Sequence, residues 1–232
     1  MSPSQALTFP DMWVDPEEDP RDRDQIEVVD ERSNLREYLR VYRITLRMKT
    51  DGLNAEQLAT RSVPPSTMSL LGLVRHLAKV ERDWFRLRAA GQEGPRLYWS
   101  EADPDQAFGG AVADESVVAE AFADWEREVA FAEAFVEEHP DLGEVYTYRD
   151  SDVISLRELL LHMVEEYARH CGHADLLREC VDGRHWPVRP SVRRSSASRR
   201  RARPSPPRSR SPASPGRPST AAGRPTARCT RP

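Results

Sequence analysis

The chain has 232 residues, of which 38% are hydrophobic and 31% are charged, and its formal net charge is −4. This low hydrophobic fraction indicates that part of the chain lies outside any packed domain. That part is the C-terminal segment 187–232, which contains thirteen Arg, ten Pro, nine Ser and no acidic residue. The formal net charge of this segment is +13, which leaves a net charge of −17 on residues 1–186. So acidic a body is a poor nucleic-acid binder, and any attraction to phosphate would come from the tail alone.

Residues 1–30 are predicted to form an acidic N-terminal arm, because Pro and Asp are frequent there. Its few apolar residues could still dock onto a domain or a second subunit; they are Phe9, Met12, Trp13 and Val14. Apolar side chains then recur at helical spacing from Leu35 to Leu46, and Asp51-Gly52 supplies a stop. This pattern predicts a first helix over residues 32–50.

A second helix is predicted after Pro64-Pro65, with Ser66 or Ser69 as the N-cap and Gly91 as the stop. Its apolar stripe runs through Leu70, Leu73, Leu77, Val80, Trp84 and Leu87. Gly72 interrupts the good helix formers and costs roughly 1 kcal/mol relative to Ala, unless two backbones approach closely there.

The third and fourth helices are predicted over residues 114–138 and 155–180, and Ser155 with Glu158 forms a capping box for the fourth. No segment shows convincing strand alternation, so we predict an all-α fold in which residues 31–186 form a four-helix bundle. The connection from Gly91 to Asp114 is too long for a tight turn and is suited to a crossover. Helices two and three would then be parallel, which gives up-down-down-up order.

The cysteines are typical of a reducing compartment, because Cys171, Cys180 and Cys229 make an odd count without a CxxC pair. The first residues show neither the basic stretch nor the apolar core of a secretory signal, and no apolar run is long enough for a membrane span. We therefore predict a cytoplasmic protein without membrane contact. Arg greatly outnumbers Lys, which hints at a GC-rich genome.

Two residues of the predicted fourth helix are placed to bind one metal ion. Glu166 and His170 lie four residues apart, so both side chains emerge on the same face, and His170 falls within the apolar arc of that helix. The alternative without a metal is that His170 is an ordinary core histidine and Glu166 an ordinary solvated glutamate. His76 lies beside the inner stripe of the second helix and could supply a third ligand from the facing side.

Two imidazoles and one carboxylate suit a divalent ion, most simply Zn²⁺, with Ni²⁺ or Mn²⁺ as alternatives. Such a set leaves coordination positions open for a water or a thiol, whose pKa the ion would lower. His173 is interpreted as a spare ligand or as a group that orients a ligand. His162 is predicted to be exposed, and Cys171 is interpreted as a small core residue.

The runs LLGLVRHLAKVERDWF and LRELLLHMVEEYARHCGHADLLRE resemble the DinB-like superfamily of four-helix bundles, as do VPPSTMSLLGLVRHL and LYWSEADPD. The resemblance covers roughly residues 9–186. Within the superfamily, the chain is most similar to an actinobacterial branch of unassigned function. It implies a metal held by His76 and by a pair spaced by four, here Glu166 and His170. A His, Glu, His set is similar to that of the N-terminal domain of mycothiol-dependent maleylpyruvate isomerase, which implies mycothiol as cosubstrate.

The leading hypothesis is a metal-dependent thiol S-transferase or detoxification enzyme that joins a thiol to a small electrophile and forms a homodimer. The alternative is a non-enzymatic bundle in which the ion is structural or absent. The tail 187–232 is predicted to be disordered, either as an arm for anionic partners or as an out-of-frame reading of GC-rich DNA. An out-of-frame reading of GC-rich DNA would by itself produce this excess of Arg, Pro and Ser.

Overall fold

The computed structural model describes residues 14, 18–149 and 152–183. The predicted tail 187–232, and Phe9, Met12 and Trp13 of the predicted arm, lie outside the described residues. Four long helices dominate: α1 (Glu31–Thr50), α3 (Leu70–Glu81) with its continuation η2 (Arg82–Ala89), α5 (Glu115–Glu138) and α6 (Leu156–Asp182). Shorter elements are η1 (Pro20–Asp22), α2 (Ala55–Ala59), α4 (Gln106–Gly109), β1 (Val145–Arg149) and β2 (Asp152–Ser155).

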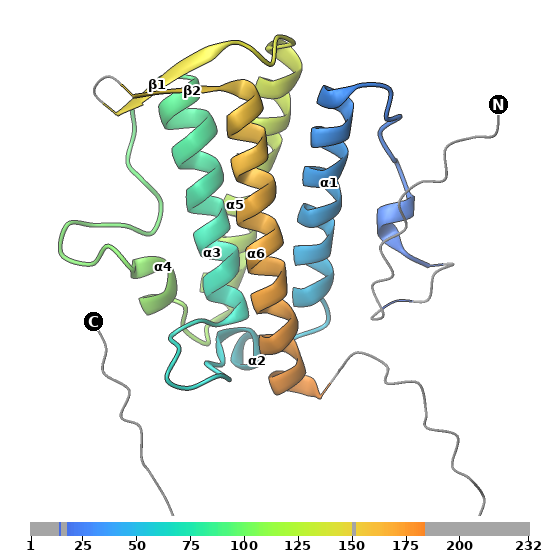
Figure 1. The fold of residues 1–232 in the computed structure, drawn as a ribbon. Coiled ribbons are helices and arrows are strands. Elements are labelled where there is room, and N and C mark those ends of the chain that lie inside the picture. Colours follow the sequence, from blue (N-terminus) through green and yellow to red (C-terminus); the bar gives the residue numbers. More distant parts are fainter. Residues whose placement is uncertain (1–13, 15–17, 150–151, 184–232) are drawn as a thin grey trace, which may run out of the picture. The chain divides into compact units, whose positions relative to one another are not determined.

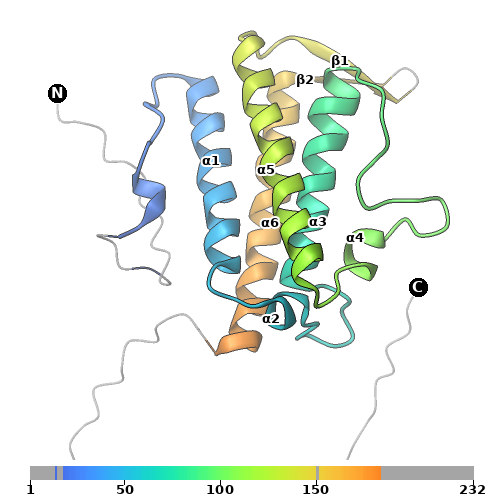
Figure 2. The same cartoon turned by 180° about the vertical axis from the view of Figure 1, so that it is seen from behind.

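The long helices lie side by side, with α1 packed mainly on α6 and α3 packed mainly on α5 (Figures 1 and 2). The chain descends through α1 towards α2, ascends through α3, returns along a long loop to α4, ascends again through α5 and descends through α6 (Figure 1). This arrangement brings α3 and α6 into contact, and these two helices carry the predicted metal ligands.

The helix starts follow from the capping residues of the sequence. Ser69, rather than Ser66, caps α3 by accepting a hydrogen bond from the Gly72 backbone. The capping box of Ser155 and Glu158 is present at the start of α6, as predicted. The predicted all-helical class is confirmed, and the four predicted helices lie within a few residues of the observed ones.

Two local features differ from the sequence-based prediction. The second helix changes to π geometry at Arg82–Ala89, where the Ala90 amide donates to the Phe85 carbonyl five residues earlier. A two-stranded antiparallel hairpin, β1 with β2, joins α5 to α6, although no strand was predicted. These strands are short, and apolar residues stand on both of their sides: Val145 and Val153 are about 60% exposed, whereas Tyr146 is buried and pairs with Ile154. No alternation of apolar and polar residues therefore marks them in the sequence.

The core contains a network of hydrogen-bonded polar side chains that joins all four long helices. Arg43 of α1 forms a bidentate ion pair with Glu81 of α3, with both N···O distances 2.9 Å. The Tyr167 hydroxyl of α6 donates to Glu81 at 2.8 Å and accepts from the Trp125 indole of α5, also at 2.8 Å. Leucines of α1, α3 and α6 belong to the same buried core cluster. The polar groups of these four side chains are therefore paired within the core.

Candidate metal centre

The structure brings His76, Glu166 and His170 together where α3 faces α6. The Nε2 atoms of His76 and His170 lie 3.6 Å and 3.5 Å from the same Glu166 carboxylate oxygen, Oε2. One possible ligand atom from each residue lies within 4.8 Å of the other two. His170 is buried, and the other two side chains are half-buried. The three residues chosen from the sequence therefore form one cluster.

Helix geometry explains why Glu166 and His170 converge. They are separated by four residues in α6, so their side chains leave the helix one above the other. His76 reaches them from α3, and its ring meets the His170 ring edge-on with centroids 4.6 Å apart. The two helices thus present donor atoms from both sides.

The carboxylate at the centre of the cluster is held in its charged form. The imidazole of His170, and next that of His76, keep the pKa of Glu166 well below its usual range, although partial burial acts in the opposite direction. An ionised carboxylate is the form that binds a cation. The electrostatic arrangement therefore favours a positive charge at this position.

The donor atoms fit a divalent ion. His76 Nε2 is buried and has no hydrogen-bond partner among the described residues, which costs free energy unless another group satisfies it. In a tetrahedral zinc site neighbouring ligand atoms lie about 3.3 Å apart. The two His–Glu separations of 3.6 Å and 3.5 Å are close to this value, so small side-chain movements would complete the set.

The other candidate residues have more ordinary surroundings. His173 Nδ1 lies 3.3 Å from His170 Nδ1, and burial, followed by the nearby His170, lowers the pKa of His173. His162, predicted to be exposed, is half-buried, because its ring packs edge-on against Trp84 at 4.7 Å. Cys171 is a buried residue of the core, in agreement with its interpretation from the sequence.

One neighbour of the site is not predicted by the sequence pattern. Phe108 of α4 stacks on the His76 ring, with centroids 5.5 Å apart and planes inclined by 25°. A Cβ atom on Gly72 would lie 2.7 Å from Phe108 Cδ1, so the glycine leaves room for this ring. Gly72 was the signal in the sequence, but its neighbour is a side chain from the crossover rather than a second backbone.

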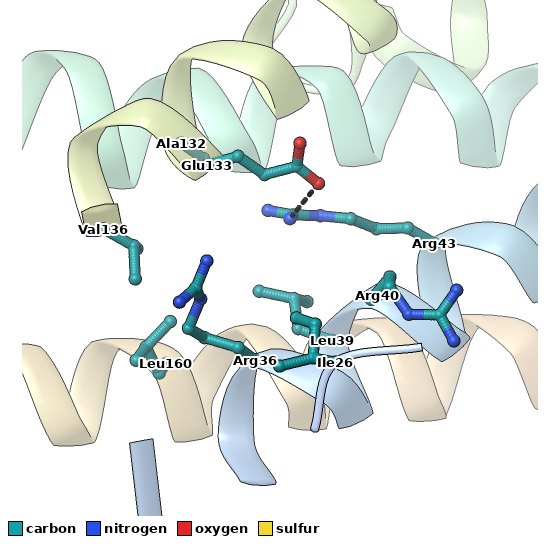
Figure 3. Close-up of a pocket in the computed structure, with 9 residues that line it drawn as sticks. All are labelled: Ile26, Arg36, Leu39, Arg40, Arg43, Ala132, Glu133, Val136 and Leu160. Atoms are coloured by element: carbon teal, nitrogen blue, oxygen red, sulfur yellow. Dashed lines mark hydrogen bonds and ion pairs between the residues drawn. The ribbon is translucent and has the colours of Figure 1, made fainter. Parts of the chain in front are cut away.

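A separate cavity of about 210 Å³ lies between α1, α5 and α6 and contains none of the three candidate ligands (Figure 3). Its lining residues are Ile26, Arg36, Leu39, Arg40, Arg43, Ala132, Glu133, Val136 and Leu160. Its three arginines form ion pairs with Glu137, Glu37 and, for Arg43, Glu81 and Glu133. The charges of this cavity are thus matched within the chain, and we assign it no ligand.

Among the described helices, none combines the length and apolar character that a membrane span requires. Comparison with curated proteins gives no match. A solved structure described as a conserved protein from Enterococcus faecalis is similar at 15% identity and a TM-score of 0.48, over 68% of this chain and all of that one.

The family described as mycothiol-S-transferase matches residues 34–183, a range that contains His76, Glu166, His170 and the four long helices. The match covers well over half of the chain and confirms the resemblance to the DinB-like proteins. The chain belongs to the mycothiol S-transferase family.

Proposed function

We propose that the protein is a metal-dependent transferase that joins mycothiol to a small electrophile. The observation that carries the proposal is the convergence of His76, Glu166 and His170 in a chain of this family, with one possible ligand atom of each residue within 4.8 Å of the other two. We propose Zn²⁺ as the ion, with Ni²⁺ and Mn²⁺ as alternatives, because nitrogen and oxygen donors in this number are typical of such ions.

A divalent ion at this position would lower the pKa of a thiol and so supply a thiolate near neutral pH. His76 and His170 would bind it through Nε2, and Glu166 through a carboxylate oxygen. One carboxylate and two neutral imidazoles leave a net positive charge in the site, which favours an anionic sulfur over a neutral one. His173, 3.3 Å from His170 Nδ1, would orient the His170 ring.

The reaction would form one carbon–sulfur bond and break one bond of the electrophile. The mycothiol sulfur supplies the electron pair, the leaving group departs with the pair of the broken bond, and the thiol proton passes to solvent. Cys171 has no place in this scheme, since it is buried in the core. The chain would contribute metal ligands rather than a covalent nucleophile.

We propose further that the protein is cytoplasmic and acts as a homodimer, and that an actinobacterial cell supplies the mycothiol. The cysteine pattern is typical of a reducing compartment and supports a cytoplasmic protein, and the Arg-rich composition supports an actinobacterial cell. Light scattering on the purified full chain tests the dimer directly.

The test of the proposed reaction is product formation from mycothiol and a panel of alkyl halides and epoxides, followed by mass spectrometry. Zinc-loaded wild type should form conjugates faster than buffer does, and His170→Ala should lose this acceleration. Transfer that continues at the wild-type rate after complete removal of metal would contradict the proposed role of the ion.

A second candidate is a non-enzymatic bundle, because Glu166 already lies between two imidazoles and this arrangement can stabilise the protein by itself. It predicts that His170→Ala lowers the free energy of unfolding without any loss of thiol binding. A variant that keeps its stability and loses thiol binding would exclude this candidate.

A further inference from the structure

The long crossover between η2 and α5 folds back so that its short helix α4 packs against α3 (Figure 1). Its short helix α4 places Phe108 on the face of the His76 ring, with centroids 5.5 Å apart. Phe108 is half-buried at this contact. A segment that connects two helices thus reaches one of the three proposed ligands.

The α3 residues that receive the crossover occupy one face of the helix. Gly72, Arg75 and His76 are related by spacings of three and four residues, so they are neighbours on the helix surface. A methyl group on residue 72 would come within 2.7 Å of Phe108 Cδ1, which is too close for carbon atoms. The absence of a side chain at Gly72 is therefore what lets Phe108 lie against His76.

Arg75 fixes α4 from the same face. Its guanidinium donates to the carbonyls of Ala107 at 3.0 Å and Gln106 at 3.2 Å, the two residues before Phe108. The guanidinium also stacks on the ring of Tyr98 at 3.9 Å from its centroid. Arg75 is buried, so these contacts are shielded from water. The backbone that carries Phe108 is consequently held in one place.

The orientation of the His76 ring needs such support. The torsion that turns an imidazole about its Cβ–Cγ bond has a broad energy profile, so the ring is not fixed by its own rotamer. Its Nε2 has no hydrogen bond to a described residue, and its nearest charged partner is the Glu166 carboxylate at 3.6 Å. The faces and edges of the ring are contacted by neighbouring rings, and Phe108 supplies the stacked contact.

We propose that Phe108 is a positioning residue for the metal site: its ring holds His76 with Nε2 directed towards Glu166 and His170. Gly72 and Arg75 in turn hold Phe108. This inference rests on the proposed function, in which these three residues bind a divalent ion. A preformed ligand orientation raises affinity because less freedom is lost when the ion binds.

The test compares zinc affinity, measured by competition with a chromogenic chelator, and the visible spectrum of the cobalt-substituted protein. Phe108→Ala should weaken zinc binding by about tenfold or more, the usual effect of losing a group that orients a ligand, and should alter the cobalt spectrum. Phe108→Tyr keeps the ring and should restore both. Phe122→Ala is the matched control, because Phe122 is also half-buried but contacts Arg47 instead of the site.

A second substitution tests the same contact from the other side. Gly72→Ala should weaken zinc binding in the wild-type background, because its methyl group displaces the Phe108 ring. In the Phe108→Ala background the clash with the ring is absent and only the Ser69 hydroxyl, 3.2 Å from the added Cβ, stays close, so Gly72→Ala should have a much smaller further effect on affinity. This non-additivity is expected of residues in contact and not of distant, independent sites.

The inference is overturned if Phe108→Ala and Gly72→Ala bind zinc like wild type while His76→Ala does not. It is also overturned if Phe122→Ala weakens zinc binding as much as Phe108→Ala, since the effect would then be a general loss of stability. If instead the proposed function is wrong, the wild-type protein itself binds no zinc, and this result is distinguishable from an effect limited to the variants. Thermal unfolding of each variant shows that the comparison is made on folded protein.

Discussion

Individual residues show that polar groups specify both the core and the site of this protein. Arg43, Glu81, Tyr167 and Trp125 form a hydrogen-bonded chain inside the bundle, with one residue from each long helix. The positions of α3 and α6 are fixed relative to each other through Glu81 and Tyr167. His76 and His170 are carried by these same two helices.

Arg43→Met should destabilise the protein by about 3–5 kcal/mol, because Glu81 would remain buried without its charge partner. The double variant Arg43→Met, Glu81→Met should recover part of this loss, since no buried charge is left unpaired. Urea denaturation of the three proteins measures the free energies of unfolding. A double variant less stable than Arg43→Met alone would contradict this view of the pair.

At the scale of elements, α6 begins at a capping box that fixes its register. The Ser155 amide and hydroxyl donate to the Glu158 carboxylate at 2.9 Å and 2.8 Å, and the Glu158 amide donates to the Ser155 hydroxyl at 3.2 Å. The hydrogen bonds from Ser155 lower the pKa of Glu158 from its ordinary value of 4.5.

This shift predicts a pH dependence for the cap. A carboxyl whose pKa is lower in the folded protein contributes stability above its unfolded pKa, and that contribution is lost as the pH falls below it. Glu158→Ala should therefore reduce the melting temperature at pH 6 (about two units above the unfolded value) and differ less from wild type as the pH falls below about 4. Glu179→Ala, near the other end of α6, is the control, because the helix dipole disfavours a carboxylate there and its removal should not lower the melting temperature at pH 6. A pH-independent effect of Glu158→Ala would contradict the assignment.

The elements also show what the sequence could predict. Capping residues and apolar spacing located the four helices, and the interval of four residues located Glu166 and His170. The hairpin β1–β2 was missed because its exposed valines give no alternation. Phe108 was missed because its contact with His76 depends on how the crossover folds back on α3, which no local pattern encodes.

For the whole molecule, the family match ends at Asp182–Gly183, where α6 and its C-cap end. The strongly basic segment 187–232 lies beyond it. All three proposed ligands therefore belong to the matched region, and the tail is not needed to explain the site.

A chain shortened to residues 1–183 should keep the zinc affinity and the melting temperature of the full chain. Any binding of nucleic acid by the full chain should be strongly salt-dependent and should disappear on truncation, because only the tail carries a large positive charge. Chelator competition, thermal unfolding and a salt series of DNA titrations check these points. Loss of zinc affinity on truncation would show that the tail contributes to the site.

His76, Glu166 and His170 together are proposed to bind one divalent ion. This is measured by elemental analysis of the purified full chain after loading with zinc and removal of excess metal. We expect about one ion per chain in wild type and a near-complete loss in His76→Ala, since two donors from α6 alone hold an ion weakly. A wild-type protein that retains no zinc, nickel or manganese would exclude a metal site at these residues.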